Sequence, residues 1–224
     1  MIYSSTLICG DLLNLGKDAE LLLSEGCSTF HIDLMDAHLV PNLCFNFDLI
    51  RALKDRYPCT IDAHLMMDNA EDYLPRLAQA GADLATIHLQ GSLQPRRALE
   101  EIRALGMKAG LALSPGEDLD AAEPYLDILD LLLIMGVRPG FSGQSFQPGC
   151  LDTLRRADAA RRERGLPLLL SVDGGIDLEN GPRCAALGAD MLVMGAFTFY
   201  RGGLSRERIR ETRQVLDGPD DPTS

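Results

Sequence analysis

Histidine and aspartate alternate with apolar residues in the segment FHIDLMDAHLVPN, which spans residues 30–42. Alternate side chains of a β-strand share one face, so a strand here would place His31, Asp33 and Met35 side by side on the same face. Burial of a charged carboxylate is costly unless it is paired, hydrogen-bonded or bound to a metal. The pattern therefore indicates a functional face rather than an ordinary core face.

Two later segments carry the same side-chain chemistry. In TIDAHLMM, Asp62, His64 and Met66 share a face by the same alternation, and LLLSVDGG ends an apolar run with Asp173. Imidazole nitrogens and carboxylate oxygens are ligands that zinc, iron and manganese accept. Two histidines and two carboxylates at the ends of strands therefore predict a divalent-metal site.

Each of these residues also has an ordinary structural interpretation. A single histidine such as His64 is more often a core or rim residue than a ligand, Asp33 could cap a helix or pair with an arginine, and Asp173 before two glycines could form a turn. Their joint placement at the ends of three strands is much harder to explain by structure alone. His88 ends another apolar run without a second ligand nearby, so we expect it to support the site, and we expect His38 to be a loop residue.

The elements that must position these residues alternate between strand and helix along the chain. Apolar runs that suit strands occur near residues 3–8, 28–34, 59–65, 83–89, 107–113, 128–135, 167–172 and 190–194. Several of the intervening helical patterns end at a glycine, where a helix C-cap needs a left-handed residue. Eight strand–helix units in about 220 residues predict an α/β fold, a closed (β/α)8 TIM barrel. We expect one barrel domain over residues 1–217 and a disordered tail over 218–224.

In such a barrel the chemistry lies at the carboxyl ends of the strands, where the four candidate ligands fall. Glycine-bearing loops follow the last three strands, at residues 135–146, 173–175 and 195–196. Small residues let backbone N–H groups approach a ligand, and phosphate sites in barrels commonly use the loops after strands seven and eight. The sequence therefore predicts a phosphate subsite beside the metal site.

Composition narrows the class of ligand. The net charge is −12, with 33 acidic and 21 basic side chains, which argues against sequence-independent nucleic-acid binding. An anionic ligand would need local backbone N–H groups and helix ends, because the overall field repels it. No apolar run reaches the ~18 residues of a membrane span, and the first residues do not resemble a secretory signal. We expect a cytoplasmic protein that does not bind membranes.

The chain has six cysteines and no CxxC pair. Without a secretory signal, they are best interpreted as reduced and mostly buried. Cys9 and Cys44 fall near the ends of predicted strands, where either could line a site. We expect both to have packing roles.

The motifs HIDLMDAHLVPN, DAHLMM, PGFSGQSF, VDGGI and GADMLVMG closely resemble the ribulose-phosphate 3-epimerase family, which includes the allulose 6-phosphate 3-epimerases. The resemblance runs from Ser4 to Phe199 and keeps the order and spacing of the motifs. It implies a barrel of the ribulose-phosphate-binding type with one divalent metal ion, which is zinc, iron, manganese, cobalt or magnesium. The metal ligands that it implies are His31, Asp33, His64 and Asp173.

The resemblance also implies the reaction, the 3-epimerisation of a ketose phosphate, and a homo-oligomer, either a dimer or a hexamer. The leading substrate pair is D-ribulose 5-phosphate and D-xylulose 5-phosphate, whose interconversion is a step of the pentose phosphate pathway. The resemblance implies that Asp33 and Asp173 are the acid and base. Two carboxylates on opposite sides of the substrate can remove a proton beside a ketone and return one to the other face, through an enediolate that a metal stabilises. The substrate-binding residues expected from the loops and the resemblance are Thr6, Met35, His64, Met66, Met135, Gly140, Phe141, Ser142, Gly143, Gly174, Gly175, Gly195 and Ala196.

The chain departs from the family pattern at several positions near the expected site. Thr6 replaces the usual serine, Ala37 replaces the glycine of MDGH, Gly136 and Arg138 replace threonine and an asparagine or acidic residue, and Ala196 replaces a serine. Since alanine lacks the freedom of glycine, we expect the turn at Ala37 to avoid a positive φ angle. None of these changes touches the four metal-site residues, so they leave the chemistry intact and the choice of sugar open.

Three alternatives remain at this point. The substrate could be another ketose phosphate, such as allulose 6-phosphate. A sugar-phosphate decarboxylase on a related barrel would need a lysine near paired aspartates at a strand end, and HIDLMD has none. A non-catalytic sugar-phosphate-binding barrel should have lost one of the four ligands, and all four are present.

Overall fold

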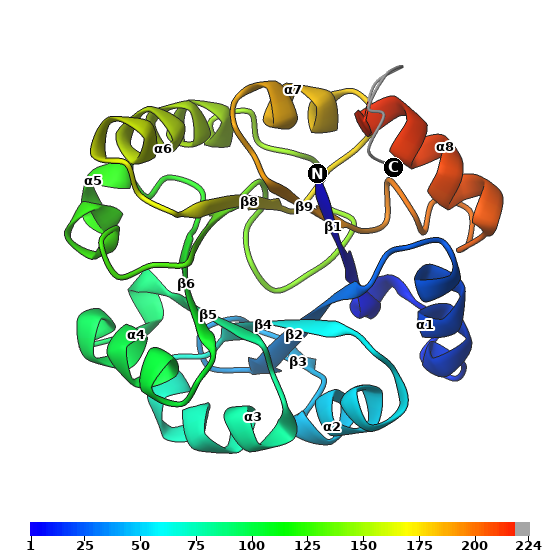
Figure 1. The fold of residues 1–224 in the computed structure, drawn as a ribbon, viewed down its shortest axis with the longest axis horizontal. Coiled ribbons are helices and arrows are strands. Elements are labelled where there is room, and N and C mark those ends of the chain that lie inside the picture. The colour runs from blue at the N-terminus through cyan, green and yellow to red at the C-terminus, as the bar shows by residue number, and fades with distance from the viewer. Residues whose placement is uncertain (218–224) are drawn as a thin grey trace.

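The computed structural model describes residues 1–217 and contains a closed barrel of parallel strands surrounded by helices (Figure 1). The tail expected at residues 218–224 lies outside the described residues. The barrel strands are β1 (Ile2–Thr6), β2 (Thr29–Asp36), β4 (Thr60–Met66), β5 (Leu84–His88), β6 (Lys108–Leu113), β7 (Leu131–Met135), β8 (Leu169–Asp173) and β9 (Met191–Met194). Pairing of β1 with both β9 and β2 closes the ring, so the prediction of a (β/α)8 barrel is confirmed.

Helices cover the outside of the barrel, as Figure 1 shows. The α-helices are α1 (Leu15–Ser24), α2 (Phe47–Arg56), α3 (Leu74–Ala80), α4 (Pro95–Ala104), α5 (Leu119–Ala122), α6 (Cys150–Arg164), α7 (Asn180–Ala186) and α8 (Arg206–Asp217). Short 3-10 helices are η1 (Leu7–Cys9), η2 (Ala70–Tyr73), η3 (Leu89–Gly91) and η4 (Glu123–Tyr125). Gly81 and Gly165 end α3 and α6 in the left-handed conformation that the sequence predicted.

Apolar side chains of residues 1–217 form three buried clusters, the two largest of which lie outside and inside the ring of strands. Phe30 and Ile32 belong to the larger cluster and are fully buried. Leu133 and Met191 belong to a smaller cluster from alternate positions of the strands. The alternation in β2 therefore turns its apolar residues toward the helices and leaves its histidine and carboxylate for the barrel interior.

Two features of the chain after β2 differ from the sequence expectation. A short strand, β3 (Leu43–Cys44), pairs antiparallel with the end of β2. Ala37 has a φ angle of 65°, so the prediction that this turn avoids a positive φ is wrong. The chain reverses there, and Asp36 Oδ1 accepts a hydrogen bond from the backbone N–H of His38 at 3.1 Å. This local turn fixes the backbone although alanine replaces glycine.

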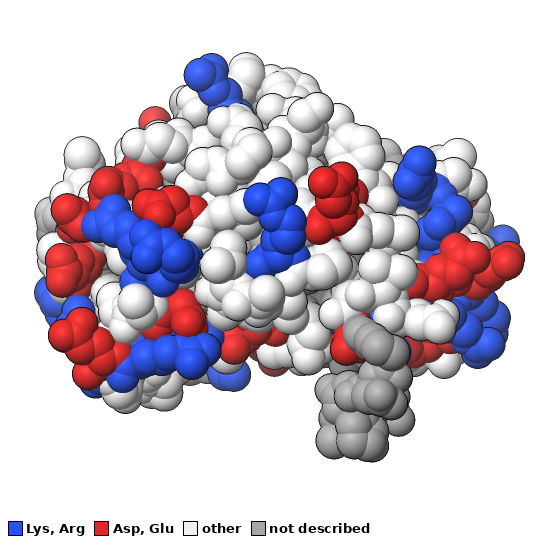
Figure 2. All heavy atoms as spheres, turned by 90° about the horizontal axis from the view of Figure 1, so that it is seen from above, with Lys and Arg blue, Asp and Glu red and all other residues white. Residues whose placement is uncertain are grey.

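The surface carries charges of both signs. Figure 2 shows one side of the molecule, on which acidic and basic side chains lie interspersed. Arg155 and Asp152 on α6 form one of the exposed ion pairs. No helix among residues 1–217 has both the length and the apolar character needed to cross a membrane. All six cysteines are free.

Candidate metal centre and active site

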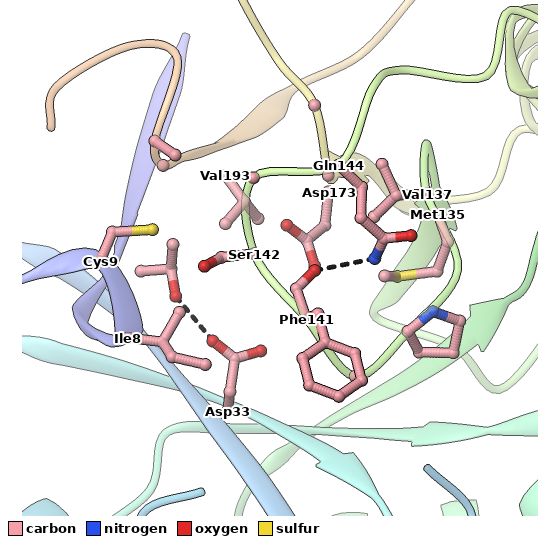
Figure 3. A pocket seen from close by; sticks show the side chains of 18 of the residues that line it. Ile8, Cys9, Asp33, Met135, Val137, Phe141, Ser142, Gln144, Asp173 and Val193 are labelled. Atoms are coloured by element: carbon pink, nitrogen blue, oxygen red, sulfur yellow. Dashed lines mark hydrogen bonds between the residues drawn. The ribbon is translucent and has the colours of Figure 1, made fainter. Parts of the chain in front are cut away.

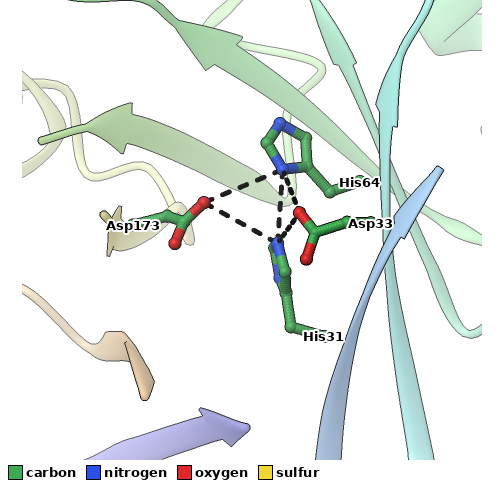
Figure 4. A group of neighbouring side chains, drawn as sticks. All are labelled: His31, Asp33, His64 and Asp173. Atoms are coloured by element: carbon green, nitrogen blue, oxygen red, sulfur yellow. Dashed lines mark hydrogen bonds and ion pairs between the residues drawn. The ribbon is translucent and has the colours of Figure 1, made fainter. Parts of the chain in front are cut away.

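Four side chains from three strands meet at the carboxyl end of the barrel (Figure 4). His31 and Asp33 come from β2, His64 from β4 and Asp173 from the last position of β8. The register of β2 and β4 pairs Asp33 with His64, so these two strands present their polar residues at the same level. One ligand atom of each residue lies within 4.8 Å of the other three. The structure thus brings together all four residues that the sequence predicted as ligands.

The spacing of these atoms suits a single small cation. His31 Nε2 lies 3.2 Å from His64 Nδ1, 3.5 Å from Asp33 Oδ1 and 3.8 Å from Asp173 Oδ2. His64 Nδ1 lies 3.6 Å from Asp33 Oδ1 and 3.8 Å from Asp173 Oδ2. Ligand bonds of ~2.0–2.2 Å in tetrahedral geometry separate ligand atoms by ~3.3–3.6 Å. The residues therefore fit one divalent cation held at the centre of the group.

Both histidines contact a further buried residue through their other ring nitrogen. His31 Nδ1 lies 2.7 Å from Asp62 Oδ2, and His64 Nε2 lies 2.8 Å from His88 Nε2. Burial and the charge of His64 lower the pKa of His88 well below its ordinary value, so this ring is neutral at pH 7. The contact agrees with the supporting role expected for His88. Asp62 had no predicted role, although it lies on the same strand face as His64.

A pocket opens beside these residues at the carboxyl end of the barrel (Figure 3). Asp33 and Asp173 face it from different sides, and Phe141 and Ser142 reach it from the loop after β7. Every predicted substrate-binding residue except His64 lines this pocket. His64 is fully buried, at the level of the metal ligands.

Three further residues lie in or near the pocket. Cys9 lines it, whereas Cys44 does not and packs against the cluster that contains Met35 and Met66. Arg138 is the one basic residue among the described residues of the lining.

A second group of side chains could also hold a cation. Asp36, His38 and Asp68 each offer a ligand atom within 4.8 Å of the others. His38 is exposed in the turn after β2, as the sequence predicted, and its Nδ1 lies 3.0 Å from Asp36 Oδ2. Unlike the buried group, this one is open to water, which competes with the side chains for coordination of a metal ion.

The model of the ribulose-phosphate 3-epimerase family matches residues 2–199 of this chain. The chain belongs to this family. Ribulose-phosphate 3-epimerase of Escherichia coli strain K12 is 38% identical over 200 residues, which cover 88% of both chains. The enzyme of the same name from Rhodobacter capsulatus is 35% identical over 205 residues, or 91% of this chain and 88% of that one. The resemblance found in the sequence motifs is thereby confirmed.

Solved structures of other enzymes share the architecture of this epimerase-family chain. Phosphoribosyl anthranilate isomerase from Thermus thermophilus is 20% identical with a TM-score of 0.66, over 97% of this chain and 98% of that one. A 3-hexulose-6-phosphate synthase is 20% identical with a TM-score of 0.64, over 96% and 98%. At this level of identity, the likeness concerns the barrel fold alone.

One departure from the family pattern has a packing explanation. A Cβ atom on Gly136 would lie 2.5 Å from the carbonyl oxygen of Gly174 and 2.8 Å from the ring of Phe146. The family's usual threonine would therefore not fit here unless both the backbone at Gly174 and the ring of Phe146 moved. Glycine at position 136 lets the loops after β7 and β8 pack directly against each other.

The two carboxylates that flank the pocket have pKa values displaced in opposite directions. Burial would raise the pKa of Asp33, but the neighbouring His31 and His64 outweigh it and hold that pKa well below its usual range. Thr6 Oγ1 also donates a hydrogen bond of 2.6 Å to Asp33 Oδ2. Burial, with a contribution from the charge of Asp33, raises the pKa of Asp173. Carboxylates whose pKa values are pushed apart suit one base and one acid.

The loop after β8 depends on Gly175 for packing, which gives a testable difference between two glycines. Gly175 (φ 70°) and Gly143 (φ 78°) both have left-handed backbones, where a side chain costs about 1–2 kcal/mol. A Cβ on Gly175 would also lie 2.7 Å from the backbone nitrogen of Phe146, whereas a Cβ on Gly143 meets nothing within 4 Å. Gly175→Ala should therefore lower the free energy of unfolding by about 1–3 kcal/mol more than Gly143→Ala. Urea unfolding measures both, and equal losses would contradict the packing role.

Proposed function

We propose that the protein interconverts D-ribulose 5-phosphate and D-xylulose 5-phosphate by epimerisation at C3. The observation that carries this proposal is the placement of Asp33 and Asp173 on different sides of one pocket, beside a ligand set that fits a divalent cation. The names of the relatives support the choice of substrate. The proposal makes the protein an isomerase, a 3-epimerase of carbohydrate phosphates.

The two aspartates act on opposite faces of the substrate. In one direction Asp33 removes the C3 proton, and the electron pair of the C3–H bond forms the double bond of an enediolate with the adjacent ketone carbon. Asp173 then delivers a proton to the other face of C3, and the ketone re-forms. In the reverse direction the two carboxylates exchange roles. The hydrogen bond from Thr6 fixes the orientation of the Asp33 carboxylate.

The metal ligands would be His31, Asp33, His64 and Asp173. When bound there, a divalent cation supplies Lewis-acid stabilisation of the negative charge that develops on the substrate oxygens. The mixed nitrogen and oxygen set accepts zinc, iron or manganese, and cobalt or magnesium also belong to the expected range. Of these four ligands, Asp33 and Asp173 also line the pocket, whereas His31 and His64 do not.

The phosphate group would bind to backbone N–H groups of Gly143, Gly174, Gly175, Gly195 and Ala196. Binding at this distance from C3 orients the sugar between the aspartates. Arg138 would offset part of the repulsion from a chain with a net charge of −12. The thioethers of Met35, Met66 and Met135 would form an adaptable apolar cover for the carbon chain. The homo-oligomer and the cytoplasmic location stay predictions from the sequence.

The phosphate subsite can be tested at Ala196, where the family usually has serine. Ala196→Ser should restore a hydroxyl donor and lower the KM for the ketose phosphate, equivalent to about 0.5–1.5 kcal/mol of binding free energy. Steady-state kinetics with the phosphorylated and unphosphorylated ketose measures the effect. The unphosphorylated sugar serves as the control, since its KM should not respond to the new hydroxyl. Equal turnover of both sugars by the wild-type protein would contradict the phosphate subsite.

A further inference from the structure

The carboxylate of Asp62 has no part in the chemistry described so far, although it is buried beneath the metal ligands. It lies in β4, two residues before His64, and is 2% exposed. Its Oδ2 atom accepts a hydrogen bond of 2.9 Å from Ser4 Oγ and lies 2.7 Å from His31 Nδ1. A buried carboxylate is costly unless it is paired, and the partners of this one are a ligand histidine and a hydroxyl group.

The contact with Asp62 decides which nitrogen of His31 can bind a cation. The Asp62 oxygen can accept a hydrogen bond from Nδ1, so a His31 ring that binds a cation keeps its proton on Nδ1 and presents the lone pair of Nε2. Nε2 is also the atom that lies 3.2 to 3.8 Å from the ligand atoms of Asp33, His64 and Asp173. The strand register supports this arrangement, because it pairs His31 with Asp62 directly.

His64 has the opposite arrangement. Its Nε2 contacts His88 Nε2 at 2.8 Å, so its Nδ1 atom is the one that faces the other ligands. The partner of His64 is a neutral ring, whereas the partner of His31 is a carboxylate. When a carboxylate accepts a hydrogen bond from an imidazole ring, that ring becomes a stronger electron donor to a metal. A neutral ring as acceptor has a smaller effect.

We propose that Asp62 is a positioning residue for the metal centre, which holds His31 in the Nδ1–H tautomer and directs its Nε2 atom at the cation. Ser4 in turn fixes the Asp62 carboxylate from β1. This inference rests on the metal site of the proposed function and deepens it. Asp62 touches neither substrate nor metal, so it acts only through His31.

The affinity for zinc in competition with a chromophoric chelator tests this role. Asp62→Asn keeps the size of the side chain and removes its charge, and it should weaken zinc binding by about 10- to 100-fold. Ser4→Ala is the matched control, because it removes the other hydrogen bond on the same oxygen and keeps the carboxylate; its loss of affinity should be smaller. Thermal unfolding of the metal-free proteins shows whether the variants fold. A lower melting temperature with unchanged zinc affinity would mean a structural role and would overturn the proposal.

A second measurement needs no variant. In nitrogen-15 NMR spectra of the zinc-loaded wild-type protein, His31 should carry its proton on Nδ1 and His64 on Nε2. A proton on Nε2 of His31 would overturn the proposal. If the wild-type chain bound no zinc, the metal site of the proposed function would fail together with this inference. If the wild-type protein and Asp62→Asn bound zinc equally well, only the role of Asp62 would fail.

Discussion

Asp173→Asn should abolish epimerisation and still allow the C3 proton of one substrate epimer to exchange with solvent. Asp173 and Asp33 reach the pocket from β8 and β2 on different sides (Figure 3). Without Asp173, Asp33 can still remove and return a proton on its own face, but no acid completes the inversion. Loss of such a group typically costs about 10²- to 10⁴-fold in rate. Proton NMR in D2O separates the exchange at C3 from the interconversion of the two sugars.

The mirror variant is the matched control for this experiment. Asp33→Asn should also lose epimerisation, and it should exchange the C3 proton of the other epimer. Both aspartates belong to the predicted ligand set, so the metal content of each variant has to be known before rates are compared. If both metal-loaded variants exchanged the same epimer, the two-base arrangement would be excluded. Near-normal epimerisation by either variant would remove that aspartate from the mechanism.

His64→Ala should remove most of the bound metal from a protein that otherwise carries about one divalent cation per chain. His64 is fully buried, and its Nδ1 atom faces His31, Asp33 and Asp173 at 3.2 to 3.8 Å. Loss of the ring leaves three ligands around a cavity, which weakens metal binding. It also removes one of the two histidines that, with His31 contributing more, hold down the pKa of Asp33. Elemental analysis after dialysis measures the metal content.

His38→Ala is the control that separates the two candidate cation sites. His38 belongs to the exposed group with Asp36 and Asp68, whose side chains lie outside the pocket lining. The purified His38→Ala variant should keep its metal. Retention of metal by His64→Ala together with its loss from His38→Ala would place the ion at the exposed group and contradict the ligand set proposed above.

The fold and the four ligands could be predicted from the sequence because both depend on periodicity. Alternation in β2 and β4 assigns His31, Asp33 and His64 to one face of each strand, whatever the rest of the chain does. Eight strand–helix units leave few closed topologies, and a barrel brings the strand ends together. Asp173 is then placed by the end of its apolar run.

Other features depend on contacts that periodicity does not encode. Asp62 shares a strand face with His64, but only the register between β2 and β4 reveals that it contacts His31. The positive φ angle of Ala37 follows from a local hydrogen bond and from the pairing of β3, which residue type alone did not indicate. Gly175 was expected to let a phosphate group approach the backbone. The structure shows in addition that it packs closely against Phe146.

The C3 proton exchange of a panel of ketose phosphates in D2O tests the central claim most directly. The panel should contain D-ribulose 5-phosphate, D-xylulose 5-phosphate, allulose 6-phosphate and the unphosphorylated pentuloses, each with metal-loaded and chelator-treated protein. The account predicts deuterium at C3 of both pentulose phosphates, interconversion of the two, and loss of both signals after chelation. The absence of C3 exchange in every ketose phosphate, or exchange that survives complete removal of the metal, would contradict it.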